Sequence, residues 1–340
     1  MEKIVLIPAY KPDKRMIDLV RTLSGMGFTV VIVDDGSGRE FRARFEEAEE
    51  CSLVVRCEKN GGKGTALKRG LAYIKENFVA PYCVITADAD GQHRVEDIAG
   101  VASLSEKNPG ALVLGCRSID KTMPPKNRWG NISTKIVFFL STGKYVHDSQ
   151  TGLRGFSDSA VDFMLNTPGT RYEYEMNVLL RWAGCDLPVA ETPIQTVYFD
   201  GNSGTHFQAF NDSVRIYREV VYHSLPSFCC FLLDVLLFGL LFYLSPLSLL
   251  GANIIARAVT AALQFLFLRY MLNTFCSDKE ISLTKYLLLS ILLLAGNTLA
   301  LWGLTAIGIV PVGAKIIVNI LFFLIGLVPR RKFIYYSKRS

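Results

Sequence analysis

The chain changes character at about residue 226, and this change constrains its fold more than any other feature. Residues 1–225 have the mixed composition of a soluble domain, whereas residues 228–329 contain long apolar runs such as Tyr286–Ala295 and Ile316–Val328. A chain of 340 residues can hold one large domain together with a membrane bundle. We therefore expect a polar domain followed by a membrane-embedded part.

The apolar part divides into four segments, each close to the roughly 20 residues that a helix needs to cross a bilayer core. The turns after the first and third segments carry no charge, whereas the loop after the second and the tail are basic. Basic loops face the cytoplasm, so we predict a cell-membrane protein whose polar domain and termini are all cytoplasmic. The predicted spans are 228–248, 250–272, 284–306 and 309–328.

Three charged residues, Asp234, Arg257 and Lys315, lie inside these predicted spans. A charge at mid-depth costs at least about 2.5 kcal/mol, so each is expected to have a partner or a task. Counting from the loops places Asp234 nearer the cytoplasmic face and the two cations nearer the outside. On this count, Asp234 is not expected to pair with Arg257.

The polar part alternates short apolar runs with helical patterns. The runs are Ile4–Ile7, Thr29–Val33 and Tyr82–Thr86, and the helical patterns cover Lys14–Met26 and Thr65–Asn77. This alternation predicts an α/β domain with a mostly parallel sheet and helices on both faces. Ligands bind at the carboxyl ends of the strands in such sheets, and the polar clusters of this sequence follow those ends.

Asp88-Ala89-Asp90 directly follows the third apolar run. On an extended segment the two carboxylates would point the same way, and Gln92 stands two residues further on. Hard oxygen donors of this kind suit Mg²⁺ or Mn²⁺ shared with a substrate diphosphate. A lone pair of this spacing is usually a solvated loop, but its place at a strand end favours a metal site.

Two other clusters have both a structural and a functional interpretation. Asp34-Asp35-Gly36-Ser37 is either a simple turn or a segment whose acids bind a base or ribose. Asn60–Thr65 opens a helix, where free N–H groups and Lys63 favour an anion. The second cluster lacks the spacing of a nucleotide-binding P-loop, which argues against ATPase chemistry.

Taken together, these motifs resemble family 2 glycosyltransferases. The order and spacing are closest to polyprenyl-phosphate sugar synthases, such as dolichol-phosphate mannose synthase and bactoprenol glucosyltransferase, over roughly residues 3–205. The motifs are Pro8-Ala9-Tyr10, Asp34–Ser37, Asn60–Gly64, Asp88–Gln92, Gly115-Cys116-Arg117 and Asp148–Phe156. The resemblance implies a GT-A nucleotide-binding fold for residues 1–205.

The resemblance also implies roles for individual residues. The nucleotide-sugar would be bound by Pro8, Tyr10, Asp34, Asp35, Lys63 and Asp88. The metal would be held by Asp88, Asp90 and Gln92. The lipid phosphate of the acceptor would be held by Arg117 and Arg128. Asp90, Arg117 and Glu175 would be catalytic.

Glu175 has both a functional and a structural interpretation. A polyprenyl phosphate is already largely ionised near neutral pH, with a second pKa of roughly 6, so it needs no general base. Glu175 would then contact the sugar or organise Arg117. A surface acid stabilised at a helix start explains it equally well.

Two further segments complete the domain prediction. Residues 206–225 have apolar side chains at helical spacing, which predicts an amphipathic helix lying in the membrane interface or packed on the polar domain. Residues 226–336 resemble the GtrA-like family through Ala256–Phe265 and the segment from Lys315 to Phe333. That resemblance implies a four-helix membrane domain that moves polyprenyl-phosphate sugars.

The sequence therefore predicts metal-dependent, inverting transfer of a sugar to polyprenyl (undecaprenyl) phosphate at the cytoplasmic face, for the cell envelope. The expected donor is a nucleoside-diphosphate sugar, UDP-hexose in preference to GDP-mannose. Membrane lipids are expected partners; nucleic acid is not, because the net charge of +6 forms no basic stripe. A homo-oligomer is left open.

Two other functions are alternatives to this one. The first is a processive polysaccharide synthase, which carries a Q-x-x-R-W signature. This chain has Asn177 four residues before Arg181-Trp182 instead. The second is a lipid-sugar transporter whose polar domain only senses a nucleotide-sugar.

Overall fold

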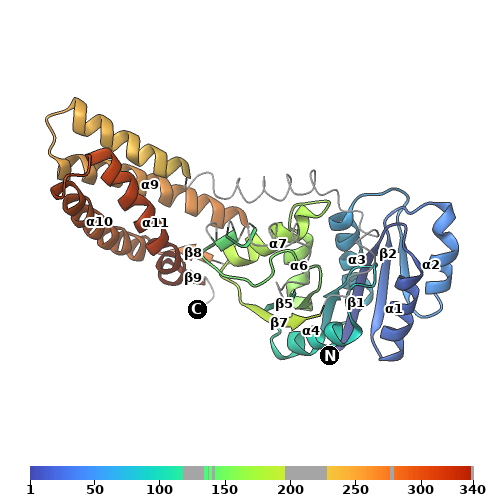
Figure 1. The fold of residues 1–340 in the computed structure, drawn as a ribbon. Helices are drawn as coiled ribbons and strands as arrows, with labels where there is room; N and C mark the ends of the chain where they lie inside the picture. The colour runs from blue at the N-terminus through green and yellow to red at the C-terminus, as the bar shows by residue number, and fades with distance from the viewer. Residues whose placement is uncertain (118–133, 137, 140–141, 196–227, 276–278, 338–340) are drawn as a thin grey trace. The chain divides into compact units, whose positions relative to one another are not determined.

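The computed structural model describes residues 1–117, 134–136, 138–139, 142–195, 228–275 and 279–337 (Figure 1). The chain forms two compact units. Unit 1 contains residues 1–137 and 145–219, and unit 2 contains residues 138–144 and 220–340. The interface helix expected over residues 206–225 lies outside the described residues, so it stays a prediction, as do the exact domain boundaries.

Unit 1 is built on a seven-stranded sheet with the strand order β3-β2-β1-β4-β6-β5-β7. Within this sheet β6 is antiparallel to its neighbours β4 and β5, and the other pairings are parallel, as the sequence predicted. The strands are β1 (Glu2–Ala9), β2 (Thr29–Asp34), β3 (Leu53–Arg56), β4 (Tyr82–Thr86), β5 (Leu112–Arg117), β6 (Arg154–Ser157) and β7 (Val189–Ile194).

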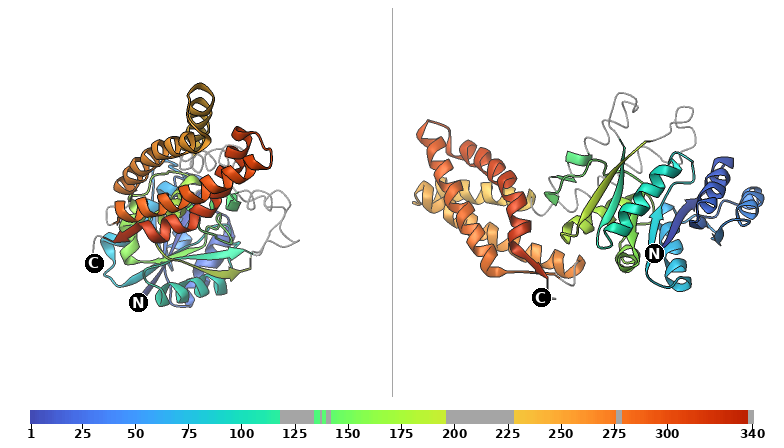
Figure 2. Two further views of the ribbon diagram at one scale, coloured as in Figure 1. Left: turned by 90° about the vertical axis from the view of Figure 1, so that its left-hand side faces the viewer. Right: turned by 90° about the horizontal axis from the view of Figure 1, so that it is seen from below.

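Helices cover both faces of this sheet, as Figure 2 shows from two further sides. Alternate residues of a strand point to opposite faces, so Val5 and Ile7 of β1 pack in the core that includes Met16 of α1. Leu6 faces the other way, against Gly70 of α3. The helices are α1 (Lys14–Gly25), α2 (Arg42–Ala48), α3 (Lys63–Asn77), α4 (Val95–Lys107), α6 (Val161–Leu165) and α7 (Glu173–Gly184).

The strand order reverses its direction between β1 and β4. The chain builds outward from β1 to β3 and then returns to place β4 on the other side of β1. The loops after β1 and β4 therefore leave the sheet in different directions. Such a reversal point, at the carboxyl ends of parallel strands, is where sheets of this type bind ligands.

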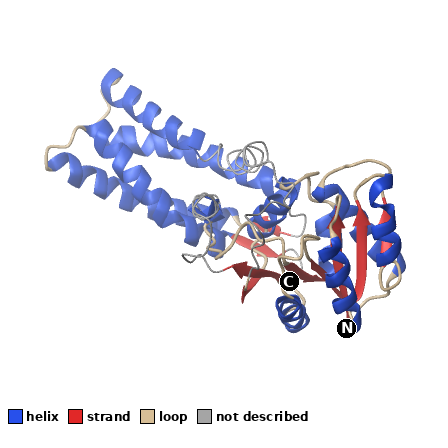
Figure 3. Ribbon diagram, turned by 45° about the vertical axis from the view of Figure 1, so that its right-hand side comes forward, coloured by secondary structure: helices blue, strands red, loops and turns tan. Residues whose placement is uncertain are grey.

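Unit 2 consists mainly of helices, drawn in blue in Figure 3, and each predicted apolar segment coincides with one of them. The stretches Leu249–Tyr270 and Leu283–Ala306 are long and apolar enough to cross a membrane, whereas the described apolar stretches of the other two helices are shorter. Four spans and their orientation stay predictions. The elements are the helix Phe228–Leu244, α9 (Leu249–Phe275), α10 (Leu283–Ala306), α11 (Pro311–Ile334) and the paired strands β8 (Lys279–Ile281) and β9 (Tyr335–Ser337).

The expectation that Asp234 does not pair with Arg257 is wrong. Oδ2 of Asp234 lies 3.5 Å from Nη1 of Arg257 and 2.8 Å from Nζ of Lys315. The first helix of unit 2 ends at Leu244, four residues before the end of the predicted span at 248. Asp234 therefore lies ten residues before the end of its helix, and Arg257 lies eight residues after the start of α9, so the two residues meet across the turn between the helices.

Candidate active site

The loop after β1 is fixed by the loop after β2. Pro8 lies near the end of β1, and Tyr10 follows the strand directly. The next residue, Lys11, has a left-handed backbone (φ of 49°), and its N–H donates to Oγ of Ser37 at 2.8 Å. The structure therefore brings the two predicted nucleotide-binding residues of the first loop next to the second loop.

Both acids of the second loop bind backbone groups. Oδ1 of Asp34 accepts the N–H of Ser37 at 2.9 Å, which closes the turn. The carboxylate of Asp35 accepts the N–H groups of Gly61 and Gly62, each at 2.8 Å. These buried acids order the loops around the predicted nucleotide pocket. Their proposed contact with a nucleotide stays a prediction.

The start of α3 differs from the free anion site that the sequence suggested. The amides of the two glycines before the helix are taken by Asp35, and the N–H of Thr65 donates to the carbonyl of Thr170 at 2.9 Å. A carboxylate of the protein thus takes two of the N–H groups that were expected to bind an anion. The first residue of α3, Lys63, places its side chain in the site.

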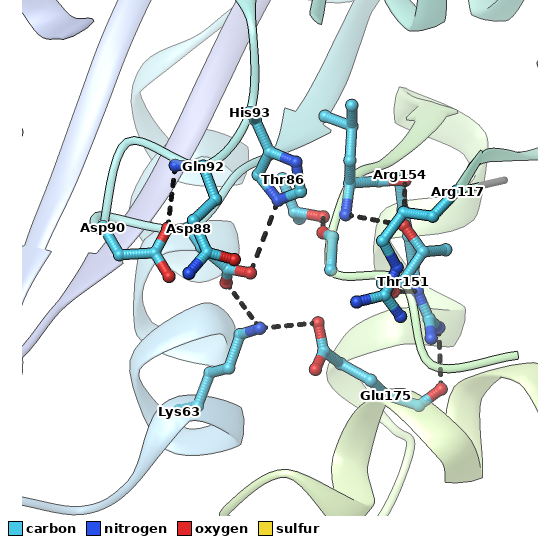
Figure 4. Close-up of polar contacts among 12 residues, drawn as sticks. Lys63, Thr86, Asp88, Asp90, Gln92, His93, Arg117, Thr151, Arg154 and Glu175 are labelled. Carbon is cyan, nitrogen blue, oxygen red and sulfur yellow. Dashed lines mark hydrogen bonds and ion pairs between the residues drawn. The ribbon is translucent and has the colours of Figure 1, made fainter. Parts of the chain in front are cut away.

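Lys63 lies between two carboxylates (Figure 4). Its Nζ is 2.6 Å from Oδ1 of Asp88 and 3.0 Å from Oε1 of Glu175. Burial lowers the pKa of Lys63, but the two carboxylates outweigh burial and raise it well above the usual range. Burial raises the pKa of Asp88, but Lys63 and then His93, whose Nε2 lies 3.4 Å from Oδ2, lower it overall. Lys63 and Asp88 are therefore both charged at neutral pH.

The second acid of the motif, Asp90, lies in a turn. The strand ends at Thr86, and Oδ1 of Asp90 accepts the N–H of Gln92 at 3.1 Å. The extended arrangement expected for the two acids is therefore wrong, because the chain turns at Ala89 and Asp90, and this hydrogen bond holds the turn. Burial and then the charge of Asp88 raise the pKa of Asp90. The two carboxylates thus repel each other.

A glycine allows the Lys63–Asp88 pair to form. A Cβ atom on Gly152 would lie 2.6 Å from Oδ2 of Asp88 and 3.0 Å from Nζ of Lys63. The carbonyl of the same glycine accepts the hydroxyl of Thr86, the last residue of β4, at 2.8 Å. The sequence motif Asp148–Phe156 contained this residue, but only the folded chain shows what it approaches.

Arg154 of the same motif is a buried link that sequence reasoning missed. Its Nε donates to the carbonyl of Thr151 at 3.0 Å, and its Nη1 donates to the carbonyl of Glu175 at 2.7 Å. It therefore joins the loop that carries Gly152 to the first turn of α7. The available signal in the sequence was the arginine within the motif Asp148–Phe156.

Arg117, at the end of β5, is held by Asp148. Its Nε and Nη2 donate to the two carboxylate oxygens at 2.6 and 3.1 Å. Burial raises the pKa of Asp148, but the guanidinium outweighs burial and lowers it. Asp148, rather than Glu175, orients Arg117, and Glu175 instead contacts Lys63. The other predicted lipid-phosphate residue, Arg128, lies outside the described residues.

The acidic turn has the chemistry of a divalent-metal site that the substrate completes. Asp88 and Asp90 offer carboxylate oxygens whose mutual repulsion a cation would relieve. Within the described ranges, no three His, Cys, Asp or Glu side chains are grouped to hold a metal. Mg²⁺ and Mn²⁺ often bind through one or two carboxylates, water and substrate phosphates. The residues therefore fit a metal–diphosphate complex.

Comparison with known proteins identifies the family. A sequence profile described as glycosyl transferase family 2 matches residues 4–164. A UDP-N-acetylglucosamine–dolichyl-phosphate N-acetylglucosaminyltransferase of Methanococcus voltae is 32% identical over 215 residues, covering 57% of this chain and 85% of that protein. The chain belongs to glycosyl transferase family 2. It is therefore a glycosyltransferase, and the acidic turn and Lys63 lie within the matched region.

Two further comparisons describe this glycosyltransferase. An undecaprenyl-phosphate 4-deoxy-4-formamido-L-arabinose transferase of Enterobacter sp. (strain 638) is 24% identical over 173 residues, which are 48% of this chain and 50% of that protein. The structure of glucosyl-3-phosphoglycerate synthase from Mycobacterium tuberculosis, in complex with Mn²⁺, UDP and phosphoglyceric acid, gives a TM-score of 0.51 at 16% identity. It covers 65% of this chain and 78% of that one, and the likeness shows the GT-A type fold of unit 1.

Proposed function

We propose that this glycosyltransferase moves a sugar from a nucleoside-diphosphate sugar to polyprenyl phosphate at the cytoplasmic face of the membrane. The observation that carries the proposal is the Lys63–Asp88–Glu175 cluster at the sheet edge where Asp148 also holds Arg117. Two related proteins are named for dolichyl-phosphate and undecaprenyl-phosphate acceptors, which supports the same acceptor class here.

The donor would lie over the loops after β1, β2 and β4. Pro8, Tyr10, Asp34 and Asp35 would line the nucleotide pocket, and a UDP-sugar is favoured because a related enzyme is named for one. Asp88, Asp90 and Gln92 would hold Mg²⁺ or Mn²⁺, which when bound would stabilise negative charge on the leaving diphosphate. The ammonium group of Lys63 adds a fixed positive charge beside the same acids.

The acceptor phosphate would be held by Arg117, together with Arg128. A guanidinium presents two parallel N–H donors to a phosphate, and Asp148 already fixes the plane of Arg117. A phosphate oxygen forms a bond to the anomeric carbon while the bond from that carbon to the donor diphosphate breaks, and the electron pair leaves with the nucleoside diphosphate. Attack from the opposite face inverts the anomeric carbon. Glu175 then serves to position Lys63 and not as a general base.

Unit 2 would place this reaction at the membrane. Four spans, of which α9 and α10 supply the long apolar stretches, would anchor the enzyme with both termini in the cytoplasm. The likeness to GtrA-like proteins extends the proposal to movement of the lipid-linked product across the membrane. A homo-oligomer would be compatible with either role.

The test is sugar transfer by the purified full-length protein with Mg²⁺ or Mn²⁺. A panel of radiolabelled UDP- and GDP-sugars would be supplied with and without undecaprenyl phosphate. Label entering the organic phase only when the lipid is present would support the reaction and name the sugar. Donor hydrolysis without lipid labelling would point to another acceptor. Absence of both donor binding and turnover would favour the transporter with a sensing domain.

A further inference from the structure

Unit 2 contains a buried polar cluster centred on Asp234, whose side chain is fully enclosed. Oδ2 of Asp234 accepts Nζ of Lys315 at 2.8 Å and Nδ2 of Asn319 at 2.6 Å. Oδ1 accepts the hydroxyl of Thr260 at 3.3 Å. The carboxylate of Asp234 is therefore well supplied with donors before any ligand is considered.

Arg257 is the second cation of this cluster, and it differs from Lys315. Lys315 is fully buried and also donates to Oδ1 of Asn253 at 2.6 Å. The side chain of Arg257 is 22% exposed, and its guanidinium approaches Asp234 only at 3.5 Å. Across the described part of unit 2, no other hydrogen-bond or ion-pair partner of this guanidinium is present. Its remaining donors are available to a ligand.

The charges of the cluster do not balance. Two cations face one carboxylate in a part of the chain that is mostly apolar. An excess charge in such surroundings is unfavourable unless it has a partner, and polar groups there usually mark a functional site. Because Lys315 is enclosed, the missing negative charge can be supplied only beside Arg257.

Arg257 borders a cavity of about 490 Å³. The cavity lies among the helix Phe228–Leu244, α9, α10 and α11, and Thr260 and Asn319 add polar groups beside Arg257. Most of the rest of its wall is apolar, with residues such as Phe265 and Leu287. This volume is in the range of ligand-binding pockets, which are typically about 300–1,000 Å³. The cavity thus combines a cationic group with a long apolar surface.

We propose that this cavity binds a membrane lipid that carries a phosphate group. The phosphate would contact Arg257, and the hydrocarbon chain would lie along the apolar wall. The charge of Arg257 and the apolar wall together select this occupant. A free phosphate would leave the apolar wall uncovered. An uncharged lipid would leave Arg257 without an anion. The inference rests on the proposed membrane placement of unit 2, and it uses none of the residues proposed for catalysis.

The test uses full-length protein in phosphatidylcholine nanodiscs and a diazirine-bearing undecaprenyl phosphate. After photolysis, cross-linked peptides are mapped by mass spectrometry. We expect labelling of the cavity-lining segments of α9 and α10, with competition by undecaprenyl phosphate but not by undecaprenol or inorganic phosphate. Phosphatidylglycerol as a competitor distinguishes a general phosphate-lipid site from an isoprenoid-specific one. Equal competition by undecaprenol would overturn phosphate recognition, and competition by inorganic phosphate would overturn the lipid assignment.

Two variants make the assignment specific. Arg257→Met should reduce cavity labelling about tenfold, because a hydrogen bond to a charged group is lost, whereas Arg269→Met on the same helix should leave labelling unchanged. Ser290→Trp fills the cavity without touching the charge cluster and should also reduce labelling. Equal labelling of wild type, Arg257→Met and Ser290→Trp would refute the site.

Failure of this inference can be told apart from failure of the proposed function. Sugar transfer at saturating acceptor should persist in Arg257→Met, since catalysis is assigned to unit 1. Cavity labelling without any sugar transfer would leave the lipid site standing and remove the proposed reaction. Sugar transfer without cavity labelling would support the proposed reaction and remove the lipid site.

Discussion

Nζ of Lys63 lies 2.6 Å from Oδ1 of Asp88, so the first residue of α3 touches the acidic turn after β4. The two residues are far apart in sequence, and the strand order brings them together because α3 leads directly into β4 beside β1. With Glu175 at 3.0 Å on its other side, Lys63 neutralises part of a strongly acidic site. A diphosphate entering this site would meet a cation that is already fixed in place.

Lys63→Met should therefore lower kcat for sugar transfer by about 100-fold or more, as loss of a fixed charge beside a leaving group does elsewhere. The matched control is Lys75→Met on the same helix, since Lys75 forms only an exposed ion pair with Asp162. The kcat of both variants is measured from steady-state sugar transfer to undecaprenyl phosphate. Turnover by Lys63→Met at the wild-type rate would remove this lysine from the catalytic site.

The two acids of the turn should differ in their effect on stability. Asp88→Asn leaves Lys63 without its nearer carboxylate and should lower the melting temperature, by about 2 °C or more for each 1 kcal/mol lost. Asp90→Asn removes a like charge near Asp88 and should leave the melting temperature unchanged or higher. Both should abolish transfer, and EDTA should abolish it in the wild type. A normal rate in EDTA would contradict the metal role.

The sheet was predictable because buried strands and amphipathic helices leave strong periodic patterns. Thr29–Val33 and Tyr82–Thr86 were placed almost to the residue, and the motifs after them lie at one edge of the sheet. The side chains that contact those motifs were not predictable from such periodic patterns. Asp148 reaches Arg117 only because the segment leading into antiparallel β6 returns to the end of β5.

Two errors have the same origin. From the sequence, Asp88 and Asp90 were predicted to lie on an extended segment, and Asp234 was predicted not to pair with Arg257. In the structure a hydrogen bond to the amide of Gln92 turns the acidic motif, and an earlier helix end brings Asp234 opposite Arg257. Local hydrogen bonds and the exact ends of helices decide such details, and neither is visible in an apolar pattern.

Gly152→Ala tests the space around the Lys63–Asp88 pair. The added methyl group would lie 2.6 Å from a carboxylate oxygen of Asp88, so the two charged side chains must move apart. We expect transfer to fall about tenfold or more, as other small misplacements of catalytic groups do, with little loss of folding. Gly100→Ala on α4 is the control, because nothing lies within 4 Å of its added methyl. Equal rates for the two variants would show that the pair tolerates displacement.

Asp148→Asn tests whether Arg117 binds the acceptor in an orientation that Asp148 sets. Asparagine keeps the shape of the side chain but removes the charge that holds Nε and Nη2 of Arg117. We expect the KM for undecaprenyl phosphate to rise about tenfold, which corresponds to roughly 1.4 kcal/mol, while the KM for the donor stays unchanged. Arg117→Ala should also raise the KM for undecaprenyl phosphate.

The double variant separates positioning from a general loss of structure. If Asp148 acts through Arg117, combining Asp148→Asn with Arg117→Ala should raise the acceptor KM no further than Arg117→Ala alone, because residues in one network are not additive. Additive effects would mean that Asp148 stabilises the site by another route. A rise in the donor KM of similar size would move Arg117 from the acceptor phosphate to the nucleotide-sugar, and the lipid would then need another cation.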